Sequence, residues 1–75
     1  MKIILYFKAG DPYGDMIRNL LRYYSIDFET VEITNNLEKI KEISGQYSTP
    51  VLQVDDKVFV GFDREKIKEV LGIKN

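Results

Sequence analysis

The 75-residue chain contains no cysteine and no histidine. Disulfide-stapled miniproteins need cysteine, and the familiar zinc and iron-sulfur sites need cysteine or histidine. Catalysis by a Ser-His-Asp or a Cys-His system needs a histidine base. These classes are therefore excluded, and we expect neither a metal nor any other cofactor.

The chain also lacks a strong charge of either sign and a long apolar run. It has 11 basic and 12 acidic side chains, so we expect no general attraction to nucleic acid or to a membrane surface. The longest apolar run, residues 3–7, is far shorter than the ~20 residues of a membrane-spanning helix. Nothing after Met1 reads as a signal peptide. We expect a cytoplasmic, monomeric protein with a single domain over residues 1–75.

The first half of the chain predicts a strand, a helix and a second strand. The β-branched and aromatic run over residues 3–7 is typical of a strand covered on both faces. Asp11 and Pro12 form a strong helix start, and apolar residues at helical spacing carry the helix to about Ser25. A second strand is expected over residues 28–33, at an edge of the sheet because it contains two glutamates.

The second half predicts a helix, a hairpin and a last helix. The first of these begins near Asn35, where Glu38 completes a pattern like a capping box, and ends at Gly45. Strands over residues 51–54 and 57–60 follow, joined by a two-residue turn. The last helix starts at Asp63 and ends at Gly72, with Lys74 favourable near its carboxyl end.

The order βαβαββα restricts the topology. A right-handed crossover makes the first two strands parallel, and the hairpin completes the same sheet. We therefore predict an α/β protein with a four-stranded mixed sheet flanked by three helices. The residues expected to share one continuous core are Ile3, Leu5, Leu20, Ile40, Val51, Val58 and Ile67.

Three segments resemble glutaredoxin motifs in the family's order. Asp11-Pro12-Tyr13-Gly14 resembles the active-site sequence Cys-Pro-Tyr-Cys, with Asp11 and Gly14 at the two cysteine positions. Residues 45–50, ending in Ser48-Thr49-Pro50, look like the segment that ends in Thr-Val-Pro. Residues 60–63 look like Gly-Gly-x-Asp. The resemblance implies a thioredoxin-like fold and a cis Thr49-Pro50 peptide facing the start of the first helix.

The resemblance also implies that the family's chemistry is missing. Thiol–disulfide exchange needs a thiolate nucleophile near the helix start and a resolving thiol one turn later. Asp11 retains a negative charge but no sulfur, and Gly14 has no side chain. We expect a redox-inactive domain in which Asp11 serves either as a helix cap or as a fixed anion that mimics the thiolate.

A noncatalytic binding module that uses the groove beside the proline is the alternative function. By resemblance, this groove binds glutathione or an extended peptide. Lys8 is either solvated, paired with Asp11 or bound to a ligand carboxylate, and Tyr13, Tyr47 and Phe62 are expected to form an apolar collar. The residues implied for ligand binding are Lys8, Tyr13, Gln46, Thr49, Pro50, Phe62 and Asp63.

Overall fold

A computed structural model describes residues 1–73 of the chain, so the position of Lys74 lies outside the described residues. The element order βαβαββα is confirmed within this range. None of the helices in residues 1–73 is long and apolar enough to cross a membrane. The elements are β1 (Ile3–Phe7), α1 (Pro12–Tyr23), β2 (Glu29–Glu32), α2 (Leu37–Ser44), β3 (Val51–Val54), β4 (Lys57–Val60) and α3 (Arg64–Val70).

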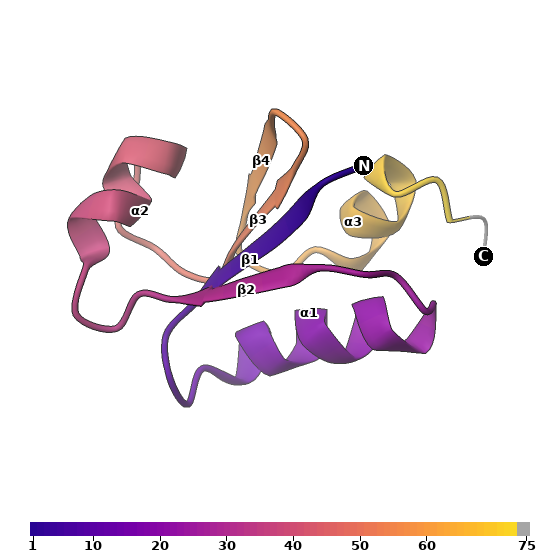
Figure 1. Cartoon of the computed structure of the whole chain (residues 1–75), viewed down its shortest axis with the longest axis horizontal. Coiled ribbons are helices and arrows are strands. Elements are labelled where there is room, and N and C mark those ends of the chain that lie inside the picture. Colours follow the sequence, from indigo (N-terminus) through magenta and orange to yellow (C-terminus); the bar gives the residue numbers. More distant parts are fainter. Residues whose placement is uncertain (74–75) are drawn as a thin grey trace.

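The four strands form one mixed sheet in the order β2-β1-β3-β4 (Figure 1). Strand β1 is parallel to β2 and antiparallel to β3, and β3 is antiparallel to β4. Tyr6 at the centre of the sheet is paired with Val31 on one side and Val51 on the other. The predicted mixed sheet and the edge position of β2 are both confirmed.

The prediction of one continuous core is wrong, because the sheet separates two apolar clusters. On one face, Leu5 and Leu52 pack with Leu20 of α1 and Ile67 of α3. On the other face, Val51 packs with Ile40 of α2 and with the partly buried Val58. Successive residues of a strand point to opposite faces, so a set chosen by hydrophobicity alone mixes the two clusters.

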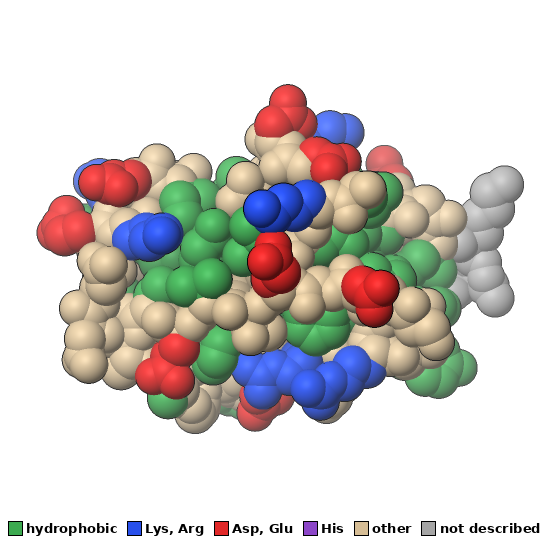
Figure 2. Space-filling view, in the orientation of Figure 1, with side chains coloured by type: hydrophobic (Ala, Val, Ile, Leu, Met, Phe, Trp, Pro, Cys, Tyr) green, Lys and Arg blue, Asp and Glu red, His purple; other side chains and the backbone are tan. Residues whose placement is uncertain are grey.

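The α2 face of the sheet is covered less fully than the opposite face. Helix α2 lies toward one end of the strands (Figure 1), and Figure 2 shows an apolar area between α2 and the strands. Ile4, Val31 and Val58 on this face are only partly buried. Helices α1 and α3 cover the other face. The packing of α1 on this face places its first turn beside the loop before β3.

The helix ends differ from the predicted ones where local turns intervene. Helix α1 ends at Tyr23 rather than Ser25, because Ser25 adopts a left-handed backbone with φ 56°. Helix α2 begins at Leu37, so the capping box from Asn35 to Glu38 is wrong. The main-chain N–H of Asn36 donates to the Ile33 carbonyl, and this turn moves the start by two residues. Asn36 is the N-cap and its side chain makes no cap hydrogen bond.

Two other predicted boundary features are confirmed. Gly45 ends α2 with a left-handed φ of 79°, and its N–H donates to the Lys41 carbonyl. Asp63 caps α3, because its Oδ1 accepts a hydrogen bond of 3.1 Å from the main-chain N–H of Lys66. Helix α3 itself ends at Val70, two residues before Gly72.

Candidate functional site

The site begins at the turn that joins β1 to α1. Gly10 has φ 80°, a backbone that glycine adopts without steric cost, and the next residue, Asp11, is the N-cap of α1. Asp11 Oδ1 accepts a hydrogen bond of 3.0 Å from the main-chain N–H of Tyr13. Pro12 follows at the first helical position, where a missing N–H costs nothing. The predicted cap role of Asp11 is therefore confirmed.

A hydrogen-bond chain from β2 holds this turn in place. The main-chain N–H of Ala9 donates to Thr34 Oγ1 at 3.1 Å. That hydroxyl in turn donates to Glu32 Oε2 at 3.1 Å. Sequence reasoning did not assign a role to Thr34. The position of Thr34 could have indicated this role, because Thr34 follows a strand that is parallel to β1. The carboxyl ends of parallel strands meet at one edge of a sheet.

The loop before β3 meets the start of α1. Thr49 Oγ1 donates to Asp11 Oδ2 at 3.5 Å, and the Thr49-Pro50 peptide bond is cis. The Pro50 carbonyl accepts a hydrogen bond of 2.8 Å from Gly61, which lies after β4. Thr49 takes part in none of the backbone hydrogen bonds found within residues 1–73. Its main-chain N–H and C=O are therefore without a backbone partner in this part of the chain.

Gly14 lies in the first turn of α1 and is buried against β1. A Cβ atom built at this position would lie 3.2 Å from the Phe7 Cβ, a tight contact. The Arg18 guanidinium lies over the Phe7 ring, 4.7 Å from the ring centroid. The site thus has a carboxylate at one predicted cysteine position and closely packed backbone at the other.

A cavity of about 290 Å³ lies beside the end of β4 and the start of α3. Its lining residues include Gln46, Asp63 and Lys66, whose side chains carry an amide, a carboxylate and an ammonium group. Gly61, which also lines the cavity, connects it to the Pro50 carbonyl. Gln46 and Asp63 were implied by the family resemblance. Lys66 was missed because a lysine on a helix face ordinarily indicates a solvated surface.

The remaining predicted site residues are spread around the start of α1 and the cavity. Tyr13 is exposed on the first turn of α1. Tyr47 donates to Glu38 Oε1 at 3.3 Å and lies under the Lys41 ammonium, so its partners are on α2. Phe62 lines a separate groove along α1. Of the three aromatic side chains predicted to form a collar, Tyr47 and Phe62 therefore have different neighbours.

Of the three alternatives given for Lys8, the ion pair with Asp11 is not formed. Within residues 1–73 the ion pairs join Lys2 to Glu29 and Arg18 to Asp15. Lys8 is half-buried and leaves the Asp11 carboxylate to Tyr13 and Thr49. In the same part of the chain, no three acidic side chains gather in a group that could hold a metal ion.

Chemically, the start of α1 and the loop before β3 offer an anion, unpaired backbone groups and a neighbouring polar cavity, but no nucleophile of the kind that exchanges disulfides. Asp11 accepts hydrogen bonds at both oxygens, and a carboxylate cannot attack a disulfide sulfur in place of a thiolate. Asp11 and Thr49 are joined by a hydrogen bond, and Asp63 lines the neighbouring cavity.

Comparison with known proteins agrees with this architecture. Residues 3–59 match the family model described as glutaredoxin. An uncharacterized glutaredoxin-like 8.6 kDa protein of the rubredoxin operon of Clostridium pasteurianum is 25% identical over 72 residues, which are 92% of this chain and 96% of that protein.

Two solved structures are similar over nearly the whole chain. A glutaredoxin from Archaeoglobus fulgidus is 29% identical with a TM-score of 0.83, over 93% of this chain and 85% of that one. Methanoredoxin from Methanosarcina acetivorans is 26% identical with a TM-score of 0.83, over 96% of this chain and 85% of that one.

Proposed function

Because this chain belongs to the glutaredoxin family and carries no cysteine, we propose that it binds a glutathione-like peptide without performing thiol–disulfide exchange. Exchange proceeds by attack of a thiolate on a disulfide sulfur. Asp11 stands at the position of the attacking sulfur and Gly14 at the position of the resolving one. The first step of the family's reaction therefore has no nucleophile, and only noncovalent binding remains.

The observation that carries the proposal is the set of charges in the cavity beside β4. Asp63 and Lys66 line it together with the amide of Gln46. The Asp63 carboxylate uses Oδ1 to cap α3, but two carboxylate oxygens offer about four acceptor positions. A ligand ammonium can therefore bind Asp63 while a ligand carboxylate binds Lys66. The γ-glutamyl end of glutathione carries these two groups on one carbon atom.

The rest of such a ligand would extend toward Thr49 and Asp11. The unpaired main-chain groups of Thr49 can pair with the cysteinyl residue of the tripeptide. Its sulfur would then lie near the Asp11 carboxylate, which can accept a hydrogen bond from a neutral S–H. A negatively charged thiolate would be repelled by the same carboxylate. The site thus favours the protonated thiol, the opposite of what disulfide exchange requires.

A second candidate ligand is an extended peptide without a γ-glutamyl group. The open backbone of Thr49 supports it, because an extended segment can pair with such groups in the manner of an added strand. This ligand would depend on Thr49 and Pro50 rather than on Asp63 and Lys66. Binding of the two candidate ligands therefore depends on different residues.

The test is a titration followed by amide chemical shifts, with reduced glutathione and S-methylglutathione as ligands. We expect both to bind, since no covalent sulfur bond forms, and to shift the amides of Gln46, Asp63 and Lys66. Reduced glutathione should bind more tightly, because only its S–H can donate to Asp11. Asp63→Asn keeps a good helix cap but removes the charge, and should weaken glutathione about tenfold. Glu65→Gln is the matched control on the same helix and should bind like wild type.

The outcomes separate the candidates. An extended acetylated peptide that binds equally well to Asp63→Asn and to wild type, while glutathione does not bind, would favour the second candidate. No shift at Gln46, Thr49 or Asp63 with either ligand at millimolar concentration would refute the proposed function.

A further inference from the structure

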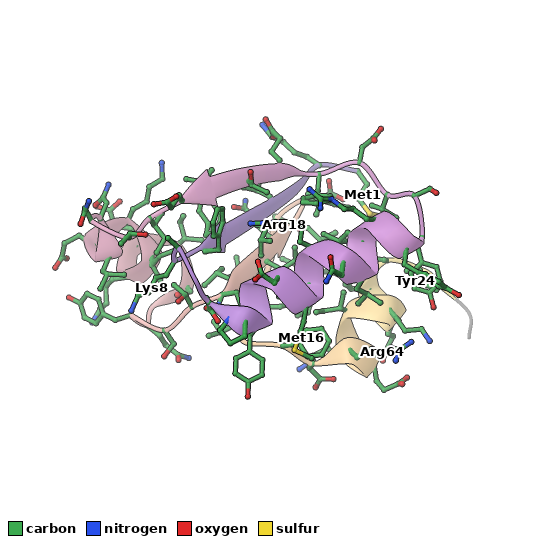
Figure 3. All side chains as sticks on the ribbon, turned by 90° about the horizontal axis from the view of Figure 1, so that it is seen from below. Met1, Lys8, Met16, Arg18, Tyr24 and Arg64 are labelled. Carbon is green, nitrogen blue, oxygen red and sulfur yellow. The ribbon has the colours of Figure 1, made fainter. Side chains whose placement is uncertain are left out.

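A second hollow lies along α1, on the other side of the loop that carries Asp63. It has a volume of about 360 Å³, and we call it the α1–α3 groove. Figure 3 shows Met16 where α1 meets the start of α3, with Arg64 on the same side. The lining residues are Met16, Asn19, Leu20, Tyr23, Phe62 and Arg64.

The apolar side chains of this groove are more exposed than the side chains that form the core of the fold. Met16 is 44% exposed and Tyr23 is 78% exposed, although both belong to α1, whose Leu20 is buried in the core. Single exposed apolar residues are ordinary. Several that line one hollow, together with the partly buried Phe62, form the kind of surface that binds a partner.

The rim of the groove is already partly ordered. The Tyr23 ring meets the Tyr24 ring edge to face, with centroids 4.9 Å apart. Leu20 and Phe62 belong to or pack against the core cluster on this face of the sheet. A partner that binds here therefore loses less free energy to the ordering of these side chains than it would on a mobile surface.

Arg64 gives the groove a charge preference. Of the lining residues, Arg64 alone is charged, and among the ion pairs of residues 1–73 it takes part in none. A guanidinium group binds a carboxylate through two parallel hydrogen bonds. An apolar hollow beside one unpaired guanidinium is complementary to an apolar side chain that is followed or preceded by an acidic one.

We propose that the α1–α3 groove is a docking site for a segment of a partner protein that presents a bulky apolar side chain next to a carboxylate. The site is separate from the ligand cavity, because Phe62 lines the groove while its neighbour Asp63 lines the cavity. A peptide in the cavity and a partner in the groove can therefore be bound at the same time. The docking site does not depend on the proposed glutathione-like ligand.

The experiment uses the full chain and two short probes, acetyl-Leu-Glu-Phe-amide and acetyl-Leu-Gln-Phe-amide. Amide shifts are followed at millimolar probe concentration. We expect the glutamate probe to shift Met16, Leu20, Phe62 and Arg64 and to bind about threefold more tightly than the glutamine probe, the size of an exposed charge pair. Equal affinity of the two probes, or shifts outside the groove, would overturn the proposal.

Three variants sharpen the result. Arg64→Gln should abolish the preference for glutamate, and Met16→Gln should weaken both probes about fivefold because an apolar contact is lost. Tyr47→Gln, which changes a half-exposed aromatic residue outside the groove, should bind like wild type. Thermal unfolding of each variant checks that the fold is retained.

A dilution series of the protein without probe tests whether a second copy of the chain occupies the groove. If the groove shifts depend on protein concentration, a second copy of the chain occupies the groove and the proposal of a separate partner fails. Unchanged groove shifts on dilution, together with the expected glutamate preference, support it. Glutathione binding is measured by the amide shifts of Gln46 and Lys66. A failure of glutathione to bind is therefore distinguishable from a failure of the groove to bind its probe.

Discussion

The hydroxyl of Thr49 donates a hydrogen bond of 3.5 Å to Asp11 Oδ2, which links two residues that are 38 positions apart. The other oxygen of the same carboxylate caps α1 through the N–H of Tyr13. One side chain therefore starts the helix and also contacts the loop that contains cis Pro50. The carboxylate of Asp11 thus makes a local contact within its own helix and a tertiary contact with a distant loop.

Replacing Asp11 by alanine should lower the free energy of unfolding by about 1 kcal/mol, because the first turn of α1 loses its cap. Asp11→Asn is the matched variant, since asparagine caps a helix about as well as aspartate. Urea unfolding at neutral pH measures both. Equal stability of Asp11→Ala and wild type would show that the cap contributes nothing.

Replacing Gly14 by alanine should not stabilise the protein, although alanine is favoured over glycine in a helix by about 1 kcal/mol. The new Cβ would meet the Phe7 Cβ at 3.2 Å, and Phe7 is packed against Arg18. We expect the crowding to offset the gain in helix propensity. A rise of about 1 kcal/mol in the unfolding free energy of Gly14→Ala would mean that β1 moves freely and would contradict this expectation.

Asp11→Cys should restore a single step of the family's chemistry. The new thiolate lies at the N-terminus of α1, where free amides and the helix dipole lower a cysteine pKa. It attacks one sulfur of glutathione disulfide, forms a protein–glutathione disulfide and releases one glutathione thiolate. Intact-mass analysis should show one glutathione adduct on this variant and none on the wild type.

The control for that variant is Asp56→Cys, which puts a thiol in the exposed β3–β4 turn, away from any helix start. It should react with glutathione disulfide more slowly at pH 7. If the two single-cysteine variants react at the same rate, the α1 terminus gives no activation and the site would not support the family reaction even with its sulfur.

Tyr6 should make stability depend on pH in the alkaline range. Burial, with a smaller contribution from the charge of Glu29, raises the pKa of Tyr6 above its ordinary value of 10.0. The unfolded chain then loses its proton at a lower pH than the folded one, so unfolding becomes more favourable as pH rises above 10. Stability from this group is complete below pH 10 and is lost as pH rises through the folded-state pKa.

Tyr6→Phe tests the sign of this effect. The variant loses the hydrogen bond of 3.2 Å from the Tyr6 hydroxyl to Gln53, and should be less stable than wild type at pH 7 by about 1 kcal/mol. Because it cannot ionise, its stability should fall less steeply above pH 10, and the difference from wild type should shrink there. A difference that stays constant from pH 7 to pH 11 would contradict a raised pKa.

Most features that depend on short stretches of chain were predicted correctly from the sequence. Asp11 and Asp63 are both N-caps as predicted, because capping depends on one side chain and the next three amides. The edge position of β2 also followed from two glutamates that cannot both be buried. The capping box at Asn35 failed because a turn from Ile33 to Asn36 competed with it.

Features that depend on facing elements needed the tertiary structure. The alternation along β3 sends Val51 and Leu52 to different clusters, and only the position of the helices shows which cluster lies on which face. The same holds for Phe62 and Asp63, which are neighbours in sequence yet line different hollows.

The sequence by itself determined the order of the elements, the N-caps of α1 and α3 and the absence of any sulfur nucleophile, because these follow from residue type and local spacing. The tertiary structure alone decided that Thr49 meets Asp11, that Lys66 joins Asp63 in one cavity and that Met16 borders a groove with Arg64. The physical reason is that side chains on separate elements become neighbours only through the packing of helices against the sheet, which the periodicity of one segment cannot specify.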